Sequence, residues 1–192
     1  MAKTSVVIPC WIIDDVQLKL TQMCVESVRE TSDAELILVD NGSKLGSDYL
    51  RDEADVYIRF PKNRGYVQAI NSGFLVASNQ YLVAGNNDFC MSSGWEEAQI
   101  EVLDNVKDAG IACLHVEGSH KHGGFIKEPG TPGGWWMIER GTLLKIGLLD
   151  GRFFNVFADY DYVWRMEDTT GLYVISTHKV TVRHHGEASL SR

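Results

Sequence analysis

The sequence predicts an α/β fold with a single, mostly parallel sheet flanked by helices. Short apolar runs rich in Val and Ile alternate with longer segments whose apolar residues recur at helical spacing, which is typical of βαβ units. The chain has 192 residues, 44% of them hydrophobic and 23% charged, which suits one stable core and is unlike a disordered chain. We therefore expect a single domain over residues 1–192, with right-handed crossovers between its parallel strands.

The first part of the chain carries the regular pattern. Each predicted strand is a short apolar run closed by a turn signal, such as the proline of VVIPC or the Asn-Gly-Ser that follows ELILVD. The predicted strands are residues 5–10, 35–40, 55–60, 81–84 and 110–115. The predicted helices are residues 15–31, 66–78 and 95–106.

This regularity ends near Val116. Residues 116–134 are rich in Gly, His and Lys and are predicted to form a long loop. After it we expect the apolar run 135–140, a short helix near 141–146, the aromatic run 152–157, a helix that begins near Asp159, and two short strands at 172–176 and 179–183.

Composition excludes several kinds of function. A net charge of -8 argues against a broad surface for nucleic-acid phosphates, although a small nucleotide could bind if a metal ion neutralised its phosphates. The apolar N-terminal run is interrupted by Pro9 and followed by Asp14 and Asp15, so a signal peptide is not expected. No stretch approaches the roughly 20 apolar residues of a membrane span. Four scattered cysteines without a C-x-x-C pair indicate a reducing, cytoplasmic setting.

Polar residues follow the predicted strands at their carboxyl ends. A single carboxylate in such a place most often caps a turn or a helix. Three polar groups on one edge of a parallel sheet, however, are typical of a ligand site. The three groups are Asp40, Asn63-Arg64-Gly65 and Asn86-Asn87-Asp88.

Two common nucleotide-binding motifs are absent. The first strand is followed by PCWIIDD, which lacks the G-x-G-x-x-G of dinucleotide-binding folds, and no P-loop pattern occurs. A bound nucleotide would therefore need a different cradle.

Six blocks of the sequence together resemble a known family. In order they are VVIPC, ILVDNGS, PKNRGYVQAINSG, YLVAGNND, GGWWMIERGTLLKIGLLDGRFFNVFADYDYVWR and VRHHGEAS. Their order and spacing, from Ser5 to about Ser189, resemble the GT-A glycosyltransferases of family 2, especially the rhamnosyltransferase-like branch. The resemblance implies a GT-A fold and a metal-dependent, inverting hexosyl transfer from a nucleotide-diphosphate sugar to the hydroxyl of a carbohydrate or lipid-linked acceptor.

The resemblance also implies which residues hold the nucleotide. Asp40 would accept a hydrogen bond from the base, and Arg64 would reach the ribose or the diphosphate. Gly65 would allow a close approach of the backbone. The implied nucleotide-binding set is completed by Pro9, Asn63 and Asn87.

A divalent cation is implied at the end of the fourth strand. The residues NND stand where the family has its D-x-D, and the last of them, Asp88, would bind Mn²⁺ or Mg²⁺ together with diphosphate oxygens. This chain has Asn86 where the first Asp is often found. His184 would supply another ligand and favour Mn²⁺ slightly, although His184 and His185 could also be surface residues near the chain end.

The predicted loop offers a rival metal cluster. His115, His120 and His122 could form a structural zinc site, but the loop lacks supporting cysteines. We expect the loop instead to close over the sugar.

The acceptor side is implied by the block that contains VFADYDYVWR. Asp159 falls on the family's catalytic base, Asp161 falls on the second Asp, and Ala158 replaces the usual Glu. Asp159 could instead only cap the helix that it begins. Further acceptor or sugar contacts are expected from Asp150, which could equally cap a turn, and from one of Trp135 and Trp136 as an apolar platform, with the other in the core.

Two other classes of protein stay open. A nucleotidyltransferase would also use a metal, but it should have a Gly-rich, basic loop after the first strand, and PCWIIDD is neither. A non-catalytic nucleotide-sugar-binding module is the second, because Asn86 and Ala158 depart from the family pattern. A glycosidase would need two carboxyls flanking one bond and would have no use for diphosphate-site residues.

Overall fold

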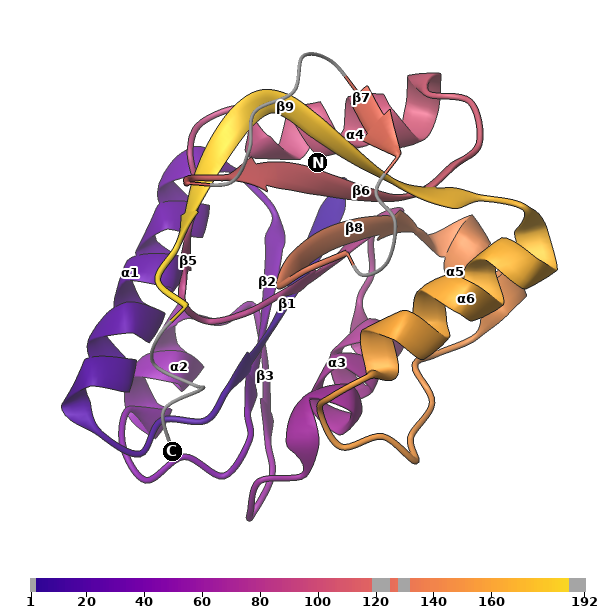
Figure 1. The fold of residues 1–192 in the computed structure, drawn as a ribbon. Coiled ribbons are helices and arrows are strands. Elements are labelled where there is room, and N and C mark those ends of the chain that lie inside the picture. The colour runs from indigo at the N-terminus through magenta and orange to yellow at the C-terminus, as the bar shows by residue number, and fades with distance from the viewer. Residues whose placement is uncertain (1–2, 119–124, 128–131, 187–192) are drawn as a thin grey trace.

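The computed structural model describes residues 3–118, 125–127 and 132–186 (Figure 1). Within these residues the strands form one curled sheet in the order β3-β2-β1-β4-β8-β6-β9-β5, with β7 paired to β9. Helices cover both faces of the sheet. The predicted α/β class is therefore confirmed.

The N-terminal half is the parallel part of the sheet. It contains β1 (Thr4–Cys10), β2 (Glu35–Asp40), β3 (Val56–Arg59) and β4 (Tyr81–Gly85), joined through α1 (Asp15–Thr31), α2 (Ser47–Glu53) and α3 (Gly65–Val76). The predicted strands and helices of this half lie within two residues of these bounds. Only α2 was not predicted, because its sequence SDYLRDE is short and mostly polar.

The remaining strands make the sheet mixed rather than mostly parallel. Strand β8 (Trp135–Glu139) runs antiparallel to both β4 and β6 (Ala109–Val116), whereas β9 (Tyr173–His184) is parallel to β6. No helix lies between β6 and β8 among the described residues, so the chain can return beside β6 without the crossover that a parallel neighbour needs. The short strands β5 (Phe89–Cys90) and β7 (Phe125–Lys127) pair antiparallel to β9.

Two predictions for the C-terminal part are corrected by this pairing. The two short strands expected at 172–176 and 179–183 are one continuous β9, whose register against β6 shifts between Leu114 and His115. The expected loop 116–134 contains β7, and its residues 119–124 and 128–131 lie outside the described residues. Helices α4 (Trp95–Asn105), α5 (Arg140–Ile146) and α6 (Ala158–Thr170) complete the fold.

The sheet separates two apolar cores, because successive residues of each strand face opposite sides. Helices α1, α2 and α4 pack on one side, around residues such as Val25, Leu50 and Trp95. Helices α3, α5 and α6 pack on the other, around residues such as Phe74 and Tyr162. No helix among the described residues is both long and apolar enough to cross a membrane.

The packing of α3 on β1 requires a glycine, and this gives a test of the fold. A Cβ on Gly73 would lie 2.2 Å from Cγ1 of Val7, which is fully buried in β1. We expect Gly73→Ala to lower the free energy of unfolding by about 1–3 kcal/mol, as overpacked cores do. Urea denaturation measures this change. Gly141→Ala in α5 is the control, because its nearest neighbour would lie 3.9 Å away, and it should not lose stability. Equal stability of the two variants would contradict the packing.

Candidate functional site

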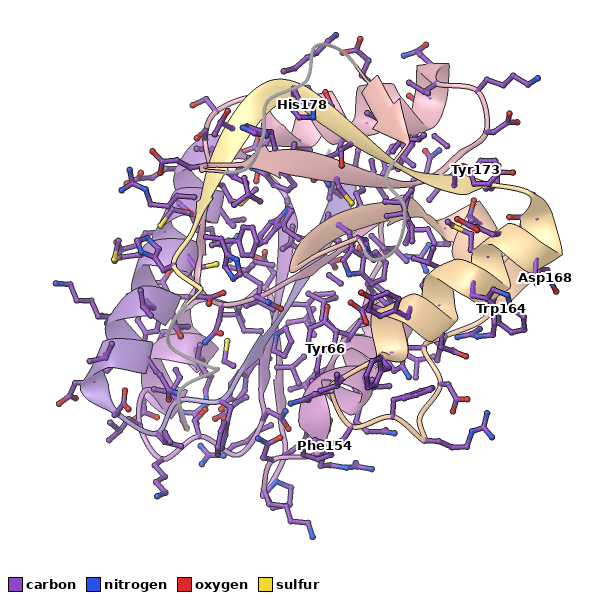
Figure 2. All side chains as sticks on the ribbon, in the orientation of Figure 1. Tyr66, Phe154, Trp164, Asp168, Tyr173 and His178 are labelled. Atoms are coloured by element: carbon purple, nitrogen blue, oxygen red, sulfur yellow. The ribbon has the colours of Figure 1, made fainter. Side chains whose placement is uncertain are left out.

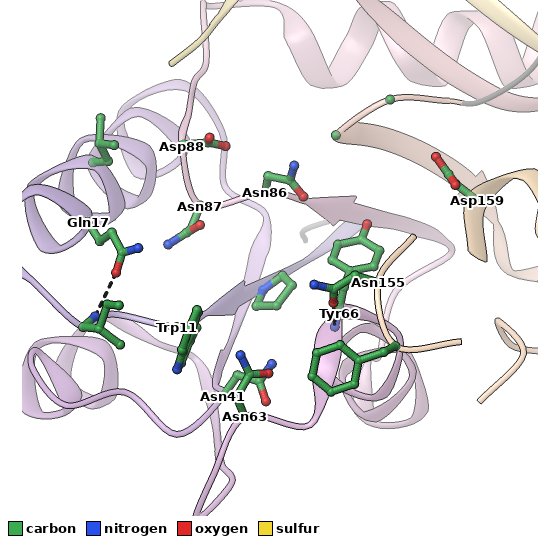
Figure 3. Close-up of a pocket in the computed structure, with 16 residues that line it drawn as sticks. Trp11, Gln17, Asn41, Asn63, Tyr66, Asn86, Asn87, Asp88, Asn155 and Asp159 are labelled. Atoms are coloured by element: carbon green, nitrogen blue, oxygen red, sulfur yellow. Dashed lines mark hydrogen bonds between the residues drawn. The ribbon is translucent and has the colours of Figure 1, made fainter. Parts of the chain in front are cut away.

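A cavity of about 750 Å³ opens at the carboxyl ends of β1, β2 and β4 (Figure 3). Its walls come from the starts of α1 and α3, from the turn before β8 and from the segment that leads into α6. None of the described residues that line it is a Lys or an Arg. Of the residues predicted from the sequence, the structure brings to this cavity Pro9, Asn63, Asn87, Asp88 and Asp159.

Asp88 lies on the α1 side of the cavity, just after β4 (Figure 3). The residue is only 6% exposed, and its Oδ1 atom has no hydrogen-bond partner among the described residues. The nearest opposite group to Oδ1 is Nε2 of His184, at 3.2 Å. A buried carboxylate oxygen without a hydrogen-bond donor is costly unless a cation or a charged partner faces it.

The pairing of β5 with β9 decides which of the adjacent histidines faces Asp88. Phe89 is the register partner of His184, and the two rings stack with centroids 4.2 Å apart. The ring of His185 instead lies against Cys90, with 3.5 Å between Nε2 and Sγ. His184 is therefore the histidine at this position, and its ring is held by stacking.

These two side chains fit a divalent cation in chemistry but do not enclose one. A carboxylate and an imidazole are suitable ligands for Mn²⁺, and the carboxylate alone suits Mg²⁺. No group of three His, Cys, Asp or Glu side chains that could hold a metal occurs among the described residues. A cation bound here would take its other ligands from water or from a phosphate-bearing substrate, as hard cations commonly do. Asn87 is engaged elsewhere, because its Nδ2 donates to the Thr21 hydroxyl at 2.7 Å.

The rival cluster in the predicted loop is not supported. His115 is buried in β6 and packs against His178 of β9, with ring centroids 4.7 Å apart. His120 and His122 lie outside the described residues.

Asp40 does not reach the cavity, which corrects its predicted contact with a base. The side chain is fully buried, and its oxygens accept hydrogen bonds from the Ser43 amide at 2.8 Å and from the hydroxyls of Ser47 at 2.7 Å and Tyr57 at 2.9 Å. Arg59 approaches to 3.4 Å. Burial alone would raise the pKa of Asp40, but these hydrogen bonds outweigh it and lower the pKa below its usual value. Asp40 is a structural carboxylate that joins β2, β3 and α2.

The next residue, Asn41, lines the cavity and was not predicted. Its Oδ1 accepts from the backbone N–H of Arg64 at 2.8 Å, and its Nδ2 donates to the carbonyl of Gly65 at 3.1 Å. Asn63 stabilises the turn in the same loop, because its Oδ1 accepts from the Gly65 N–H at 2.8 Å. Asparagine at a strand end is an ordinary turn signal, so the sequence pattern alone did not single out Asn41.

Arg64 and Gly65 also differ from their predicted roles. The Arg64 side chain is exposed and lies over the Phe60 ring, 5.0 Å from its centroid, rather than in the cavity. Gly65 has φ +85°, and a Cβ on it would lie 2.4 Å from the Phe154 carbonyl oxygen. The glycine therefore allows another segment of this chain, not a ligand, to approach the backbone.

Neither tryptophan of the Gly-Gly-Trp-Trp run offers an exposed ring. Trp135 is 2% exposed and Trp136 is 1% exposed. Both are buried because β8 is an inner strand covered on both faces, so each ring enters a different core. The prediction of an apolar platform for a sugar at one of them is wrong in this structure.

The three acidic residues of the acceptor block separate into different environments. Asp150 accepts hydrogen bonds from Arg152 side-chain and backbone N–H groups, which lower its pKa to about 2, and it does not line the cavity. Asp161 forms an ion pair with Arg165 at 2.9 Å, also outside the cavity. Asp159 alone of the three lines the cavity, across from Asp88 (Figure 3).

Asp159 is not the cap of its helix. The N-cap position of α6 is Phe157, whose φ of 67° is rare for an aromatic residue, and no side chain makes a cap hydrogen bond there. Among the described residues, the hydrogen bond that the Asp159 carboxylate accepts comes from the adjacent Tyr160 N–H, at 3.0 Å. It is therefore available to a molecule in the cavity, as the base interpretation requires.

Other residues of the cavity were also missed by sequence reasoning, among them Trp11, Tyr66 and Asn155. Trp11 has a 45% exposed ring that lines the cavity, and Tyr66 points its hydroxyl into it from the first turn of α3. Asn155 accepts from the Tyr66 backbone N–H at 2.7 Å. The aromatic residues were missed because they occur in apolar stretches that also predict core positions.

Comparison with known proteins identifies the class of fold. The fold is similar to that of a solved structure described as GalNAc-T7 with UDP, GalNAc and Mn²⁺, with a TM-score of 0.79 and 15% identity over 96% of this chain and 44% of that one. It is also similar to a structure described as mannosyltransferase PcManGT from Pyrobaculum calidifontis in complex with GDP-Man and Mn²⁺, with a TM-score of 0.71 and 16% identity over 95% of this chain and 56% of that one. The fold is therefore that of the GT-A glycosyltransferases.

The family follows from the sequence match. The model of the family described as "Glycosyl transferase family 2" matches residues 5–160, so the chain belongs to glycosyl transferase family 2. The match is to the family as a whole, and the rhamnosyltransferase-like branch stays a prediction. No curated protein matches the chain. The chain spans about half the length of the two solved structures, at 44% and 56%.

The hydrogen bonds of Asp40 give a pH-dependent test of the structure that lies beneath the site. Because the folded-state pKa of Asp40 is lowered, its stabilising effect should be complete above the unfolded value of about 4 and lost as the pH falls through the folded value. We expect Asp40→Asn to lower the free energy of unfolding by about 1–3 kcal/mol at pH 7, with a smaller difference from wild type below about pH 4. Urea denaturation across pH measures it. Asp48→Asn is the exposed control and should change little, and a pH-independent loss at Asp40 would argue against the charged network.

Proposed function

We propose that this protein transfers a sugar from a nucleotide-diphosphate sugar to an acceptor hydroxyl, by a single, inverting displacement that depends on a divalent cation. The observation that carries this proposal is the cavity at the carboxyl edge of the sheet, which two carboxylates line from opposite sides. One of them, Asp88, has a buried oxygen with no hydrogen-bond donor among the described residues, and the other, Asp159, accepts only from the adjacent Tyr160 N–H in the described part of the chain. The membership in glycosyl transferase family 2 agrees with it.

The donor side of the reaction is assigned to the Asp88 end of the cavity. The two similar structures are described with UDP or GDP-Man and with Mn²⁺, so we extend a nucleotide-diphosphate donor and a cation to this chain. Asp88 and His184 would hold the cation, which when bound would neutralise the diphosphate and stabilise the leaving group. Asp88 Oδ1 lies 3.2 Å from His184 Nε2, and the stacking of Phe89 keeps the imidazole in place.

The base of the nucleotide is assigned to the wall formed by Trp11 and Asn63. The exposed indole face of Trp11 suits a planar heterocycle, and the amide of Asn63 is on the same part of the wall. Asp40 has no part in this contact, because its oxygens are already used.

The acceptor side is assigned to Asp159. A sugar nucleotide carries its own leaving group, so one base that removes the acceptor's proton is sufficient for direct displacement. The acceptor would approach the anomeric carbon from the Asp159 side, opposite the diphosphate, and this in-line arrangement inverts the configuration. The hexosyl class of the sugar and the cytoplasmic location stay predictions.

A binding module without turnover is the second candidate. Ala158 is buried and apolar where the family has a carboxylate, and Asn86 carries no charge at the cation site. A nucleotidyltransferase is less favoured, because the cavity has no basic loop among its described residues. Release of nucleoside diphosphate from a panel of sugar nucleotides, with and without candidate acceptors, separates these classes.

The cation assignment can be tested without turnover. Asp88→Ala should abolish the Mn²⁺-dependent part of UDP or GDP binding, weakening it more than about tenfold, because the principal oxygen ligand is gone. Isothermal titration calorimetry with each nucleotide, with and without Mn²⁺, gives the affinity. His184→Ala should weaken the Mn²⁺ dependence less, and His185→Ala, whose ring faces Cys90, is the matched control. Unchanged Mn²⁺-dependent affinity in the Asp88 variant would remove the cation from this place.

The assignment of the base predicts a separation of binding from transfer. Asp159→Asn keeps the size of the side chain but cannot take the acceptor's proton, so kcat should fall about 100-fold or more while sugar-nucleotide affinity is retained. Steady-state transfer kinetics and calorimetry measure the two quantities. Asp161→Asn is the control, since Asp161 is paired with Arg165 away from the cavity, and it should lose far less activity. Transfer near the wild-type rate by the Asp159 variant would place the base elsewhere.

A further inference from the structure

Tyr66 lines the cavity, and the proposed reaction has no role for it so far. It lies in the first turn of α3, and its side chain is half-buried. Its hydroxyl points into the part of the cavity that Asn86 and Asp159 also line (Figure 3). Figure 2 shows the same residue between α3 and the sheet, whereas Trp164 lies on the outer side of α6.

The Tyr66 hydroxyl is engaged from the side of the core by Trp136. This indole is 1% exposed, and its ring is fixed by contacts with Phe74 and Tyr162 at centroid distances of 5.8 and 5.7 Å. An indole N–H can only donate, so in the interaction of Trp136 with Tyr66, which lowers the pKa of the phenol, the Tyr66 oxygen is the acceptor. The phenol is therefore anchored from a rigid, buried position.

With its oxygen accepting from Trp136, the phenol still has one hydrogen bond to donate. A phenol has one proton to donate, and accepting from Trp136 does not use that proton. The proton is free for the cavity side, where Asp159 is close enough to act on the phenol by its charge. Burial and the charge of Asp159 both raise the pKa of Tyr66, so the phenol keeps its proton at neutral pH.

Tyr66 and Asp159 face the same space without bonding to each other. No hydrogen bond joins the two side chains in the described structure. Their spacing is fixed through the backbone, because the Tyr66 N–H donates to Asn155 Oδ1 at 2.7 Å and the Val67 N–H donates to the Phe154 carbonyl at 3.4 Å. The pair therefore presents one donor and one acceptor, at a spacing fixed by these backbone contacts, to a molecule bound between them.

We propose that Tyr66 binds the acceptor substrate by donating a hydrogen bond to a hydroxyl oxygen next to the one that Asp159 deprotonates, so that the site selects a vicinal diol of a sugar ring. This rests on the proposed function. A lone alcohol would satisfy only one of the two groups and would leave the other unpaired in the cavity, which costs affinity. The acceptor is the substrate in question because Tyr66 is on the Asp159 side, away from Asp88.

The test compares each acceptor with an analogue that lacks one hydroxyl. Methyl glycosides of common hexoses serve as acceptors, with the sugar nucleotide that wild type uses best, and each active glycoside is compared with its monodeoxy analogue at the neighbouring position. For wild type we expect kcat/KM for the acceptor to fall about tenfold on the deoxy analogue, the effect of one lost hydrogen bond. For Tyr66→Phe, kcat/KM for the parent glycoside should be about tenfold lower than for wild type. The deoxy analogue should cause no further loss of kcat/KM in this variant, and the KM for the donor should equal that of wild type.

Two controls separate recognition from stability. Tyr66→Phe removes the oxygen that interacts with Trp136, so thermal unfolding is used to check that the variant is folded. The preference of wild type for the parent over the deoxy analogue is measured without any variant. Tyr160→Phe removes the hydroxyl of an exposed tyrosine next to Asp159 and should retain the wild-type preference.

Other results overturn the inference. In Tyr66→Phe, kcat/KM could fall by the same factor for the parent and the deoxy acceptor, or the KM for the donor could rise. In either case Tyr66 does not recognise the neighbouring hydroxyl. Wild type could transfer sugar only to isolated alcohols such as a serine peptide or an alkyl alcohol, in which case the inference fails and the proposed function survives. Absence of nucleoside diphosphate release with every sugar nucleotide would remove the proposed function itself.

Discussion

The geometry of the site depends on the hydrogen bonds of Asn41. Its backbone N–H donates to the Cys10 carbonyl at 2.7 Å, and its amide binds the backbone of Arg64 and Gly65. The side chain is only 4% exposed, and each of these polar groups has a partner, so the loop into α3 is held in one conformation. Asn155 then binds the first turn of α3, and this places the segment before α6 relative to the ends of β1 and β2. Asp159 is positioned over the sheet edge through this series of hydrogen bonds.

The fold was predictable where it is built from local units. The parallel half follows from strands and helices whose signals lie within a few residues of each other, so its elements were located within two residues. The direction of β8 was not predictable in the same way, because it is decided by pairing of residues 135–139 with Tyr81–Gly85, far away in the sequence. The polar stretch near Thr177 looked like a break in β9, but the strand continues because a register shift against β6 absorbs the irregularity.

The candidate site was predictable only in part, for a related reason. Strand ends can be recognised from sequence, so Asn63 and Asp88 were found, but the direction in which each side chain points depends on the strand's pairing. Asp40 and Asn41 are adjacent, yet the carboxylate enters a buried network while the amide faces the cavity. Trp135 and Trp136 are both buried because an inner strand has no exposed face. Tyr66 needed the structure, since the sequence does not show that its hydroxyl points into the cavity.

The charge of the cavity explains how its two carboxylates can have different roles. Asp88 and Asp159 line it, and no Lys or Arg is among its described lining residues. An anionic diphosphate would be repelled by these carboxylates. In the proposed function a divalent cation would supply the positive charge, at the oxygen of Asp88 that has no donor among the described residues. The cation would also hold Asp88 as a ligand and so remove it from proton transfer. Asp159, on the opposite side of the cavity, would then be the carboxylate that remains for the acceptor's proton in the proposed reaction.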